Sequence, residues 1–432
     1  MGGGMRGGMR GTGAHLKPGV MFIFITVCLD MMALGLAIPV LPRLIEQFVG
    51  SVSAASWWSG VFNSLWGFTQ FVCSPILGSL SDRFGRRPII LLSNLGLALD
   101  YLIMALSGNL MWLLIGRLLN GVTSSSITTA YAYISDISEP DERAQMYGYI
   151  GAAFGVGFVM GPALGGMLGH IDLRLPFWVA GGLSLLNAAY GALVLPESLD
   201  KDHRKPFCLK SANPIGSILF LWKAKSVMRL ALISMVSNFA HHVIPATFVL
   251  YASYRLGWGQ REVGLAMAYY AVWAVIVQGG LTGMVVKAIG EKATLVVGLL
   301  CGVAGFMSYG YNTDWRVFLF TIPIMSFWGM TNAALQSLMT TRVGNSDQGL
   351  LQGAVNSLMS LSGIVAPFVF GYILSVMTRP GVDKVWSGAA FFSAALVLGV
   401  AFLMALGVRD RLKGEPVPAK QPVVHHDGEP LF

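Results

Sequence analysis

The sequence predicts an all-α polytopic membrane protein with twelve transmembrane helices. Its composition and its long apolar stretches are the two observations behind that prediction. Of the 432 residues, 54% are hydrophobic and only 12% are charged, whereas a soluble protein is about 25% charged. The mean hydropathy is +0.64, so the chain could not cover a water-facing surface. Its four cysteines are scattered without a framework spacing, which excludes a disulfide-stapled secreted scaffold.

Gaps between Asp, Glu, Lys and Arg locate the spans, because a membrane helix needs about 20 largely apolar residues. Nine charge-free stretches are long enough, namely 47–81, 144–171, 175–196, 230–254, 263–286, 293–313, 317–341, 348–378 and 385–408. Three further apolar segments carry one charge each, namely 19–41 with Asp30, 88–107 with Asp100 and 109–134 with Arg117. Strands of a membrane barrel would be about half as long and would alternate, so helices are the interpretation.

The distribution of lysine and arginine predicts that both termini lie in the cytoplasm. An even number of spans places both termini on one side, and that side collects 20 of the 29 basic residues, against 7 on the opposite side. Cytoplasmic loops carry such an excess. The net charge of +8 is therefore a topology signal that faces anionic lipid, and nucleic acid is not expected as a partner.

The chain divides into two six-helix halves joined by its longest hydrophilic loop. The expected parts are a disordered cytoplasmic N-terminus (1–18), an N-terminal bundle (19–197), a cytoplasmic linker (198–227), a C-terminal bundle (228–408) and a disordered cytoplasmic tail (409–432). A shift of 205 residues superimposes Gly78 on Gly283, Gly85 on Gly290, Gly148 on Gly353, Pro162 on Pro367 and Gly166 on Gly371. Parallel repeats of this kind are typical of two-bundle transporters.

The loop between the second and third spans has the sequence GSLSDRFGRRP, with Gly78, Asp82, Arg83, Gly85, Arg86 and Arg87. Its glycines permit a tight turn, and its aspartate can pair with nearby guanidinium groups. Basic residues alone would indicate only a cytoplasmic turn. The whole pattern, G-x-L-x-D-R-x-G-R-R, resembles the signature loop of the major facilitator superfamily. The resemblance implies a cytoplasmic gate, a latch between the two halves during alternating access.

The fifth span carries the pattern G-x8-G-x3-G-P-x2-G-G, formed by Gly148, Gly157, Gly161, Pro162, Gly165 and Gly166. Small residues at helical spacing permit close helix packing, and proline bends a helix. Packing alone would account for part of the pattern. The pattern also resembles the motif that marks proton-driven drug antiporters, which implies export by exchange.

Three charges lie inside predicted spans, namely Asp30, Asp100 and Arg117. A charged residue at mid-membrane costs about 2.5–3.5 kcal/mol on insertion scales, so it needs a partner, a cavity or a proton. One interpretation is a static buried pair that only fixes packing. The other is a proton or substrate site in which the pairing of a carboxylate with Arg117 changes through the transport cycle.

Other polar residues in the spans are candidates for the same route. Gln70, Gln278 and Gln336, together with Asn63, Asn332 and Asn356, could line a cavity or form interhelical hydrogen bonds. His241 and His242 in the seventh span could carry a proton, because imidazole titrates near physiological pH. Neighbouring helical residues point about 100° apart, so at most one of the two histidines faces the cavity well.

From about Phe22 to Val408 the chain resembles the tetracycline-efflux group of the drug:proton antiporters. The resemblance includes D-x8-P-x2-P at Asp30, the Gly78–Pro88 loop, L-D-Y at Asp100, Y-I-S-D at Asp136, D-E-R-A at Asp141, L-P-E-S at Leu195–Ser198, A-L-Q at Gln336 and Q-G-x-L-Q-G at Gln348–Gly353. It implies the major facilitator fold of two pseudo-symmetric bundles in a bacterial inner (plasma) membrane. It also implies that the inward carboxylates and Gln70 lie along the route of substrate and protons.

The same resemblance implies a transporter rather than an enzyme. No cofactor or metal site is expected, since a proton gradient supplies the energy, with the substrate carried free or as a divalent-metal chelate. The expected partners are a small-molecule drug, protons and the lipid bilayer, and a monomer is the expected functional unit.

The second half departs from the family pattern. Gly302 stands where tetracycline exporters carry a carboxylate in the ninth helix, and a histidine of the eighth helix is replaced at about Ala274. Coupling could have moved to His241 or His242 with Asp30 and Asp100, or the substrate could be a different one.

Three functions remain open on the sequence. The first is export of tetracycline-like or other amphiphilic drugs in exchange for protons. The second is proton-coupled or facilitative transport of a native small metabolite. The third, a non-transporting sensor or scaffold, predicts an appended soluble domain. ATP-driven transport is not expected, because the sequence has no G-x4-G-K-[ST] phosphate-binding loop.

Overall fold

The computed structural model describes residues 18–138, 142–200, 202, 204, 225–343 and 348–408. Within these ranges every regular element is a helix. Ten helical segments there are long and apolar enough to cross a membrane. The predicted all-α polytopic fold is therefore confirmed. The expected disorder before residue 18 and after residue 408, and almost all of the expected linker, lie outside the described residues.

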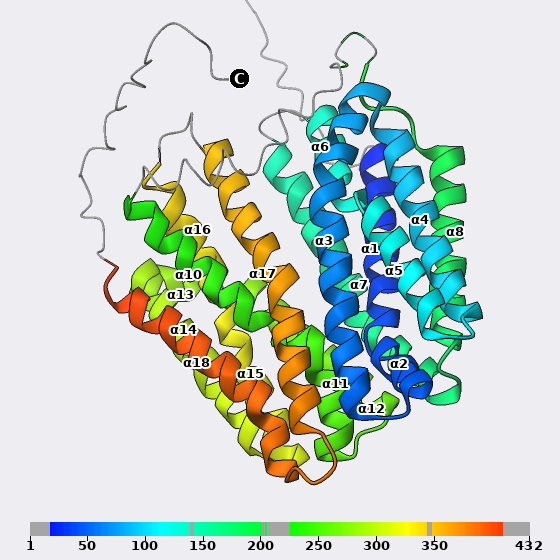
Figure 1. Ribbon diagram of the computed structural model, residues 1–432. Helices are drawn as coiled ribbons and strands as arrows, with labels where there is room; N and C mark the ends of the chain where they lie inside the picture. Colours follow the sequence, from blue (N-terminus) through cyan, green and yellow to red (C-terminus); the bar gives the residue numbers. More distant parts are fainter. Residues whose placement is uncertain are drawn as a thin grey trace, which may run out of the picture.

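The N-terminal half contains eight helices that make up the first six predicted spans. They are α1 (Pro18–Ala37), α2 (Leu41–Val49), α3 (Val52–Phe84), α4 (Arg86–Leu106), α5 (Leu110–Thr123), α6 (Ser126–Ile137), α7 (Arg143–Ile171) and α8 (Leu175–Val194). Helix α3 and the pair α5 and α6 are not among the ten apolar segments. All three helices pack against α4 in the N-terminal half (Figure 1), and together with the ten apolar segments they give twelve spans in the described chain.

The C-terminal half provides the other six spans. They are α10 (Lys225–His241) with α11 (Val243–Leu256), α12 (Gln260–Val275) with η3 (Ile276–Leu281) and α13 (Thr282–Ile289), α14 (Glu291–Tyr311), α15 (Trp315–Ser326) with η4 (Phe327–Gly329) and α16 (Met330–Thr340), α17 (Gln348–Met377), and η6 (Lys384–Gly388) with α18 (Ala389–Leu406).

Several spans are interrupted where the sequence predicted continuous helices. The first breaks between α1 and α2 at residues 38–40, next to Pro39 and Pro42, because proline cannot continue the helical hydrogen-bond ladder. In the C-terminal half the seventh span breaks at His242, the eighth contains the π-helix η3, and the tenth contains the 3₁₀ turn η4. Irregular backbone at membrane depth is tolerated only inside protein or beside a cavity. We therefore expect these breaks to lie inside protein or beside a cavity.

The two halves pack against each other along two crossings, α3 with α17 and α7 with α12. At the first crossing, Ser53 Oγ donates a hydrogen bond of 2.7 Å to the carbonyl oxygen of Ser375. A Cβ atom at Gly371 would lie 2.7 Å from the carbonyl oxygen of Ser56 and 2.8 Å from the Cα atom of Gly60. Only glycine allows the two backbones to approach so closely.

The second crossing repeats the first at the same place in the other half. A Cβ atom at Gly166 would lie 2.5 Å from the carbonyl oxygen of Gln260 and 2.7 Å from the Cα atom of Gly264. Gly166 and Gly371 are the residues that the 205-residue shift superimposes. Another such pair, Gly85 and Gly290, has matching positive φ angles of 110° and 83°. The internal repeat is therefore present in the backbone.

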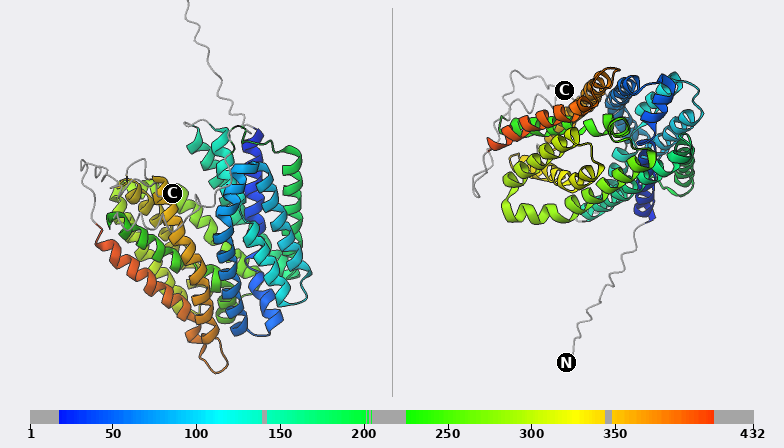
Figure 2. Two further views of the ribbon diagram at one scale, coloured as in Figure 1. Left: turned by 45° about the horizontal axis from the view of Figure 1, so that its top comes forward. Right: turned by 90° about the horizontal axis from the view of Figure 1, so that it is seen from below.

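The halves approach closely at only one end of the bundle. Contacts run from Ser53–Ser375 to Gly67–Gly363 at the first crossing, and from Gly166–Gly264 to Gly155 and Val275 at the second. Toward the other end, several glycines on these helices would have no atom within 4 Å of an added Cβ, namely Gly78, Gly148, Gly151, Gly279, Gly280 and Gly283. Figures 1 and 2 show the halves diverging toward the end that carries the α3–α4 loop, the predicted cytoplasmic end.

Substitution of Gly371 by valine should destabilise the protein by about 1–3 kcal/mol, because its side chain would press against the backbone of α3. The measurement is the thermal midpoint of the detergent-purified protein. Gly399→Val is the matched control, because a Cβ atom at that position in α18 would have no neighbour within 4 Å. Equal midpoints for the two variants would contradict the close crossing of α3 and α17.

Candidate functional site

Three charged side chains are buried in the N-terminal half, and the structure sorts them into two groups. Asp30 on α1, Asp100 on α4 and Arg117 on α5 are 2%, 0% and 6% exposed. Arg117 Nη1 lies 3.6 Å from Asp100 Oδ2. Asp30 instead accepts a hydrogen bond of 3.0 Å from Asn187 Nδ2 on α8. The carboxylate that pairs with Arg117 in this structure is therefore Asp100.

The pair of Asp100 and Arg117 is close but is not hydrogen-bonded. In the described part of the chain, neither carboxylate oxygen of Asp100 nor Nε of Arg117 has a hydrogen-bond partner. Gly116 makes room for the carboxylate, because a Cβ atom there would lie 2.7 Å from Asp100 Oδ1. The guanidinium carbon of Arg117 lies 5.4 Å from the ring centroid of Trp66, whose Nε1 donates to Asn120 Oδ1 at 2.8 Å. The aromatic face supports the cation, and the unused hydrogen-bonding capacity leaves the pair able to rearrange.

Asp30 belongs to a separate polar cluster between α1 and α8. Asn187 bonds both to Asp30 Oδ1 and to Thr26, whose Oγ1 donates to Asn187 Oδ1 at 3.1 Å. The second carboxylate oxygen of Asp30 has no hydrogen-bond partner among the described residues. Asn187 was not predicted as a site residue from the sequence. It is an amide side chain in a charge-free span, and the sequence does not show that its partner lies 157 residues away.

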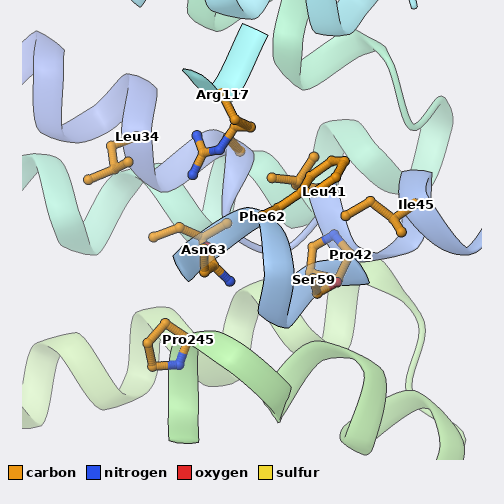
Figure 3. Close-up of a pocket in the computed structure, with 11 residues that line it drawn as sticks. Leu34, Leu41, Pro42, Ile45, Ser59, Phe62, Asn63, Arg117 and Pro245 are labelled. Carbon is orange, nitrogen blue, oxygen red and sulfur yellow. The ribbon is translucent and has the colours of Figure 1, made fainter. Parts of the chain in front are cut away.

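Arg117 also lines a pocket between the two halves. Figure 3 shows its guanidinium facing the space opposite Pro245 of α11, with Asn63 between them. The pocket is predominantly apolar and draws its walls from α1, α2, α3, α5 and α11. Its lining residues are Leu34, Ala37, Ile38, Leu41, Pro42, Ile45, Ser59, Phe62, Asn63, Arg117 and Pro245.

The two histidines of the seventh span face different neighbours. The ring of His241 lies 5.6 Å from the ring of Trp328 on η4. The Nε2 atom of His242 would lie 3.4 Å from a Cβ atom at Gly363 on α17. The two imidazole planes are 79° apart. His241 therefore faces the tenth span, and His242 faces the eleventh near its crossing with α3.

Trp328 occupies the space beside Gly302. A Cβ atom at this buried glycine would lie 2.9 Å from Trp328 Cγ and 2.6 Å from Leu398 Cδ2. The indole Nε1 donates a hydrogen bond of 3.1 Å to Ser237 Oγ, and the ring contacts Phe306 at 5.3 Å. A carboxylate at position 302 would collide with the indole, which gives the departure at Gly302 a physical reason. Trp328 was not predicted as a site residue, because the contacts of a tryptophan in an apolar span cannot be predicted from the sequence.

The predicted glutamines lie at three different places. Gln70 Nε2 donates a hydrogen bond of 3.2 Å to Ser124 Oγ, at the break between α5 and α6. Gln278 on η3 reaches the neighbourhood of Trp328, since its Nε2 would lie 2.7 Å from a Cβ atom at Gly329. Gln336 is exposed on α16. The structure therefore brings Gln278 to the histidine and tryptophan cluster and places the other two elsewhere.

The α3–α4 loop is held by an ionic network. Arg86 Nη1 donates to Asp82 Oδ1 at 2.6 Å, and its Nε donates to Asp136 Oδ2 on α6 at 3.0 Å. The carboxylate of Glu197, just after α8, accepts from the backbone N–H of Arg86 at 2.8 Å. Gly85 has a φ of 110° and lies against Glu197, so no other residue fits the turn. Glu197 is a loop partner that the sequence analysis did not assign.

The other basic residues of this loop are also bound within the N-terminal half. The backbone N–H of Arg87 donates to Glu197 at 3.3 Å, and its Nη2 donates to the carbonyl oxygen of Ala192 at 2.5 Å. The guanidinium of Arg83 lies 5.2 Å from the ring of Phe84. The contacts named here for Arg83, Arg86 and Arg87 all lie within the N-terminal half.

The glycines of the fifth-span motif allow α7 to pack closely on two helices. Cβ atoms at Gly157, Gly161 and Gly165 would collide with backbone atoms of α1. A Cβ atom at Gly166 would collide with the backbone of α12. The motif thus joins the fifth span both to its own half and to the opposite half.

Comparison with known proteins identifies the family. The model of the Major Facilitator Superfamily matches residues 23–311 and 230–428. The chain belongs to the major facilitator superfamily. This major facilitator is 36% identical to the tetracycline resistance protein, class C, of Escherichia coli, over 86% of this chain and 93% of that protein. It is 34% identical to the tetracycline resistance protein, class G, of Vibrio anguillarum, over 86% and 94% of the two chains.

The likeness to solved structures concerns the fold. The nucleoside transporter NupG superimposes with a TM-score of 0.73 at 12% identity, over 90% of this chain and 99% of that chain. The chain is therefore a transporter rather than an enzyme, and its resemblance to the tetracycline resistance group is confirmed.

Removal of one partner of the Asp100–Arg117 pair should destabilise this major facilitator by about 3–5 kcal/mol, because the other charge stays buried without compensation. We expect Arg117→Met to lower the thermal midpoint strongly and Asp100→Asn with Arg117→Met to recover much of the loss. Thermal unfolding of the two single variants and the double variant measures the coupling. Additive losses in the double variant would show that the two side chains do not interact.

Proposed function

We propose that this major facilitator exports tetracycline-like or other amphiphilic drugs in exchange for protons by alternating access. The two tetracycline resistance proteins, similar over most of their length, support the substrate class. The predicted fifth-span motif supports the antiport direction. The observation that carries the proposal is the buried pair of Asp100 and Arg117, whose arginine also lines the pocket between the halves.

The charges of this site can couple proton movement to drug movement. With Asp30 and Asp100 ionised, the three buried groups carry one net negative charge, which favours a cationic or hydrogen-bond-donating drug. Protonation of Asp100 removes the partner of Arg117, and protonation of Asp30 removes the remaining negative charge. The cavity wall then carries an unpaired guanidinium that repels a cation in this low-dielectric setting. Proton and drug therefore exclude each other, as an exchanger requires.

The carboxylates have the capacity that this exchange needs. The second oxygen of Asp30 and both oxygens of Asp100 lack hydrogen-bond partners in the described chain. A proton can satisfy each of these oxygens, while Arg117 is the member of the group that lines the pocket. Gln70, Gln278 and Gln336, with His241 and His242, are proposed to line the same route.

Alternating access would be a rocking of the two halves about the glycine crossings. The halves meet at the end that carries α2 and diverge at the end that carries the α3–α4 loop. In the proposed orientation that open end is cytoplasmic, as are both termini, and the membrane is a bacterial inner membrane. The loop of Gly78, Asp82 and Arg83 would then latch the halves when the cytoplasmic end closes. A monomer would be the transporting unit.

The test is drug-driven proton release from proteoliposomes loaded with a pH-sensitive dye. We expect tetracycline, or another amphiphilic drug of a panel, to release protons in a protein-dependent manner. Parallel runs with and without Mg²⁺ decide whether a divalent chelate is the transported form. Proton release by no drug, with exchange of a polar metabolite instead, would overturn the proposal in favour of a metabolite transporter.

Asp100→Asn should abolish drug-driven proton exchange while the protein still reaches the membrane, because the amide cannot take up or release a proton and leaves Arg117 permanently without its carboxylate partner. The matched control is Asp314→Asn, which changes a carboxylate at the start of α15, where asparagine can still cap the helix. We expect exchange close to wild type for the control. Undiminished exchange in Asp100→Asn would refute its role in coupling.

A further inference from the structure

The imidazole of His241 is exposed although it lies in the middle of the seventh span. Its neighbours Ala240 and Val243 on the same span are buried, whereas His241 is exposed. A polar ring turned toward lipid would be costly, so such a residue usually faces the interior of the bundle or a water-filled cavity. The next helical turn of the seventh span indicates which of these two surroundings His241 has.

The next turn of the seventh span reaches the pocket. Pro245, four residues later, lines the pocket together with Arg117. Residues i and i+4 share one face of a helix and are about one turn apart. The helical hydrogen bonds continue through the break, since the N–H of Ala246 donates to the carbonyl oxygen of His242 at 3.2 Å. His241 therefore lies on the same face of the span as Pro245, one turn from the pocket lining and nearer the open end.

The ring of His241 packs against the indole of Trp328. Trp328 is 5% exposed and contacts His241 at 5.6 Å, with the two planes 46° apart. Its indole is held by the hydrogen bond to Ser237, by Phe306 and by the space at Gly302. Gln278 adds an amide from the eighth span beside the same turn. His241 thus packs on Trp328 on one side, while the residue as a whole stays exposed.

The C-terminal half differs in charge from the N-terminal half in this region. In the described ranges 225–343 and 348–408, the carboxylates are Glu262, Glu291, Asp314 and Asp383, and each lies at the start of a helix. Around His241 the C-terminal half therefore offers the aromatic ring of Trp328 and the amide of Gln278 instead of a carboxylate.

We propose that the open face of His241, supported by Trp328, is the subsite on which a planar aromatic ring of the drug stacks. The inference rests on the proposed function and specifies its substrate class. Planar conjugated compounds bind this subsite through ring contact, without a divalent cation. His241 is the binding residue, and Trp328 and Gly302 are positioning residues that act through it.

The test measures binding to the detergent-purified full chain in the presence of a metal chelator. The probes are tetracycline and ethidium, which are planar and aromatic, and dodecyltrimethylammonium, which has no ring. Loss of one aromatic contact should weaken binding of the two planar probes by about three- to tenfold in His241→Ala. His241→Phe should keep binding within about twofold, because phenylalanine preserves the ring. Binding of dodecyltrimethylammonium should be the same in all variants.

The positioning residues give a second, independent set of variants. Trp328→Ala and Gly302→Ala should both weaken the planar probes, the latter because its Cβ would displace the indole. Trp328→Phe should restore binding. Gly399→Ala, in open space on α18, is the matched control for the glycine change. In transport, His241→Ala should raise the KM for tetracycline while leaving kcat close to wild type.

The outcomes separate the subsite from the proposed function. Unchanged binding of tetracycline and ethidium in His241→Ala would overturn the subsite, and so would an equal loss for dodecyltrimethylammonium. Failure of His241→Phe to restore binding would also overturn it, because ring contact alone would then not account for binding. If the wild type binds the planar probes through His241 but releases no protons with any drug, the exchange proposal fails and the subsite stands.

Discussion

The close approach of backbones at the glycine crossings is the constraint on which the rest of this transporter depends. Inside a bilayer the hydrophobic effect does not draw helices together, so small residues and the contacts they permit decide which helices meet. Gly60 with Gly371 and Gly166 with Gly264 bring the halves into contact at one end. The other end lacks such contacts, and the halves diverge there. Between the halves lies the pocket that Arg117 lines, and Asp100 reaches it only through its pairing with Arg117.

The two halves share one internal repeat but contribute different side chains to the space between them. The N-terminal half supplies Asp30, Asp100 and Arg117, all of them buried. The C-terminal half supplies His241 and Trp328. In the proposed mechanism, electrostatic sensing and ring recognition are therefore carried by separate halves. A proton taken up in the N-terminal half would change the charge that the drug meets without disturbing the surface on which the drug stacks.

The sequence could predict the spans because hydropathy is a property of the chain itself. The expected segment 175–196 corresponds to α8 at Leu175–Val194, and 348–378 corresponds to α17 at Gln348–Met377. The buried charges could be predicted for the same reason, since each interrupts an apolar run. Their partners could not be predicted. Asn187 binds Asp30 across 157 positions, and Trp328 covers Gly302 from another helix. A single sequence contains no record of such neighbours.

The glycines at the open end bear on how that end could close during alternating access. Gly78 and Gly148 lie on α3 and α7, the same helices whose glycines form the closed seam, and Gly283 lies on α13, which continues the span of α12. A residue with a side chain would block close approach at these positions, as valine would at Gly371. Their freedom from contacts within 4 Å leaves room for the backbones to meet there. Both ends of the seam therefore carry glycines. Closing one end while opening the other would exchange one set of backbone contacts for a similar set. The free-energy difference between the two states can then be small. In the proposed exchange, the protonation of Asp30 and Asp100 and the presence of drug would decide which end is open.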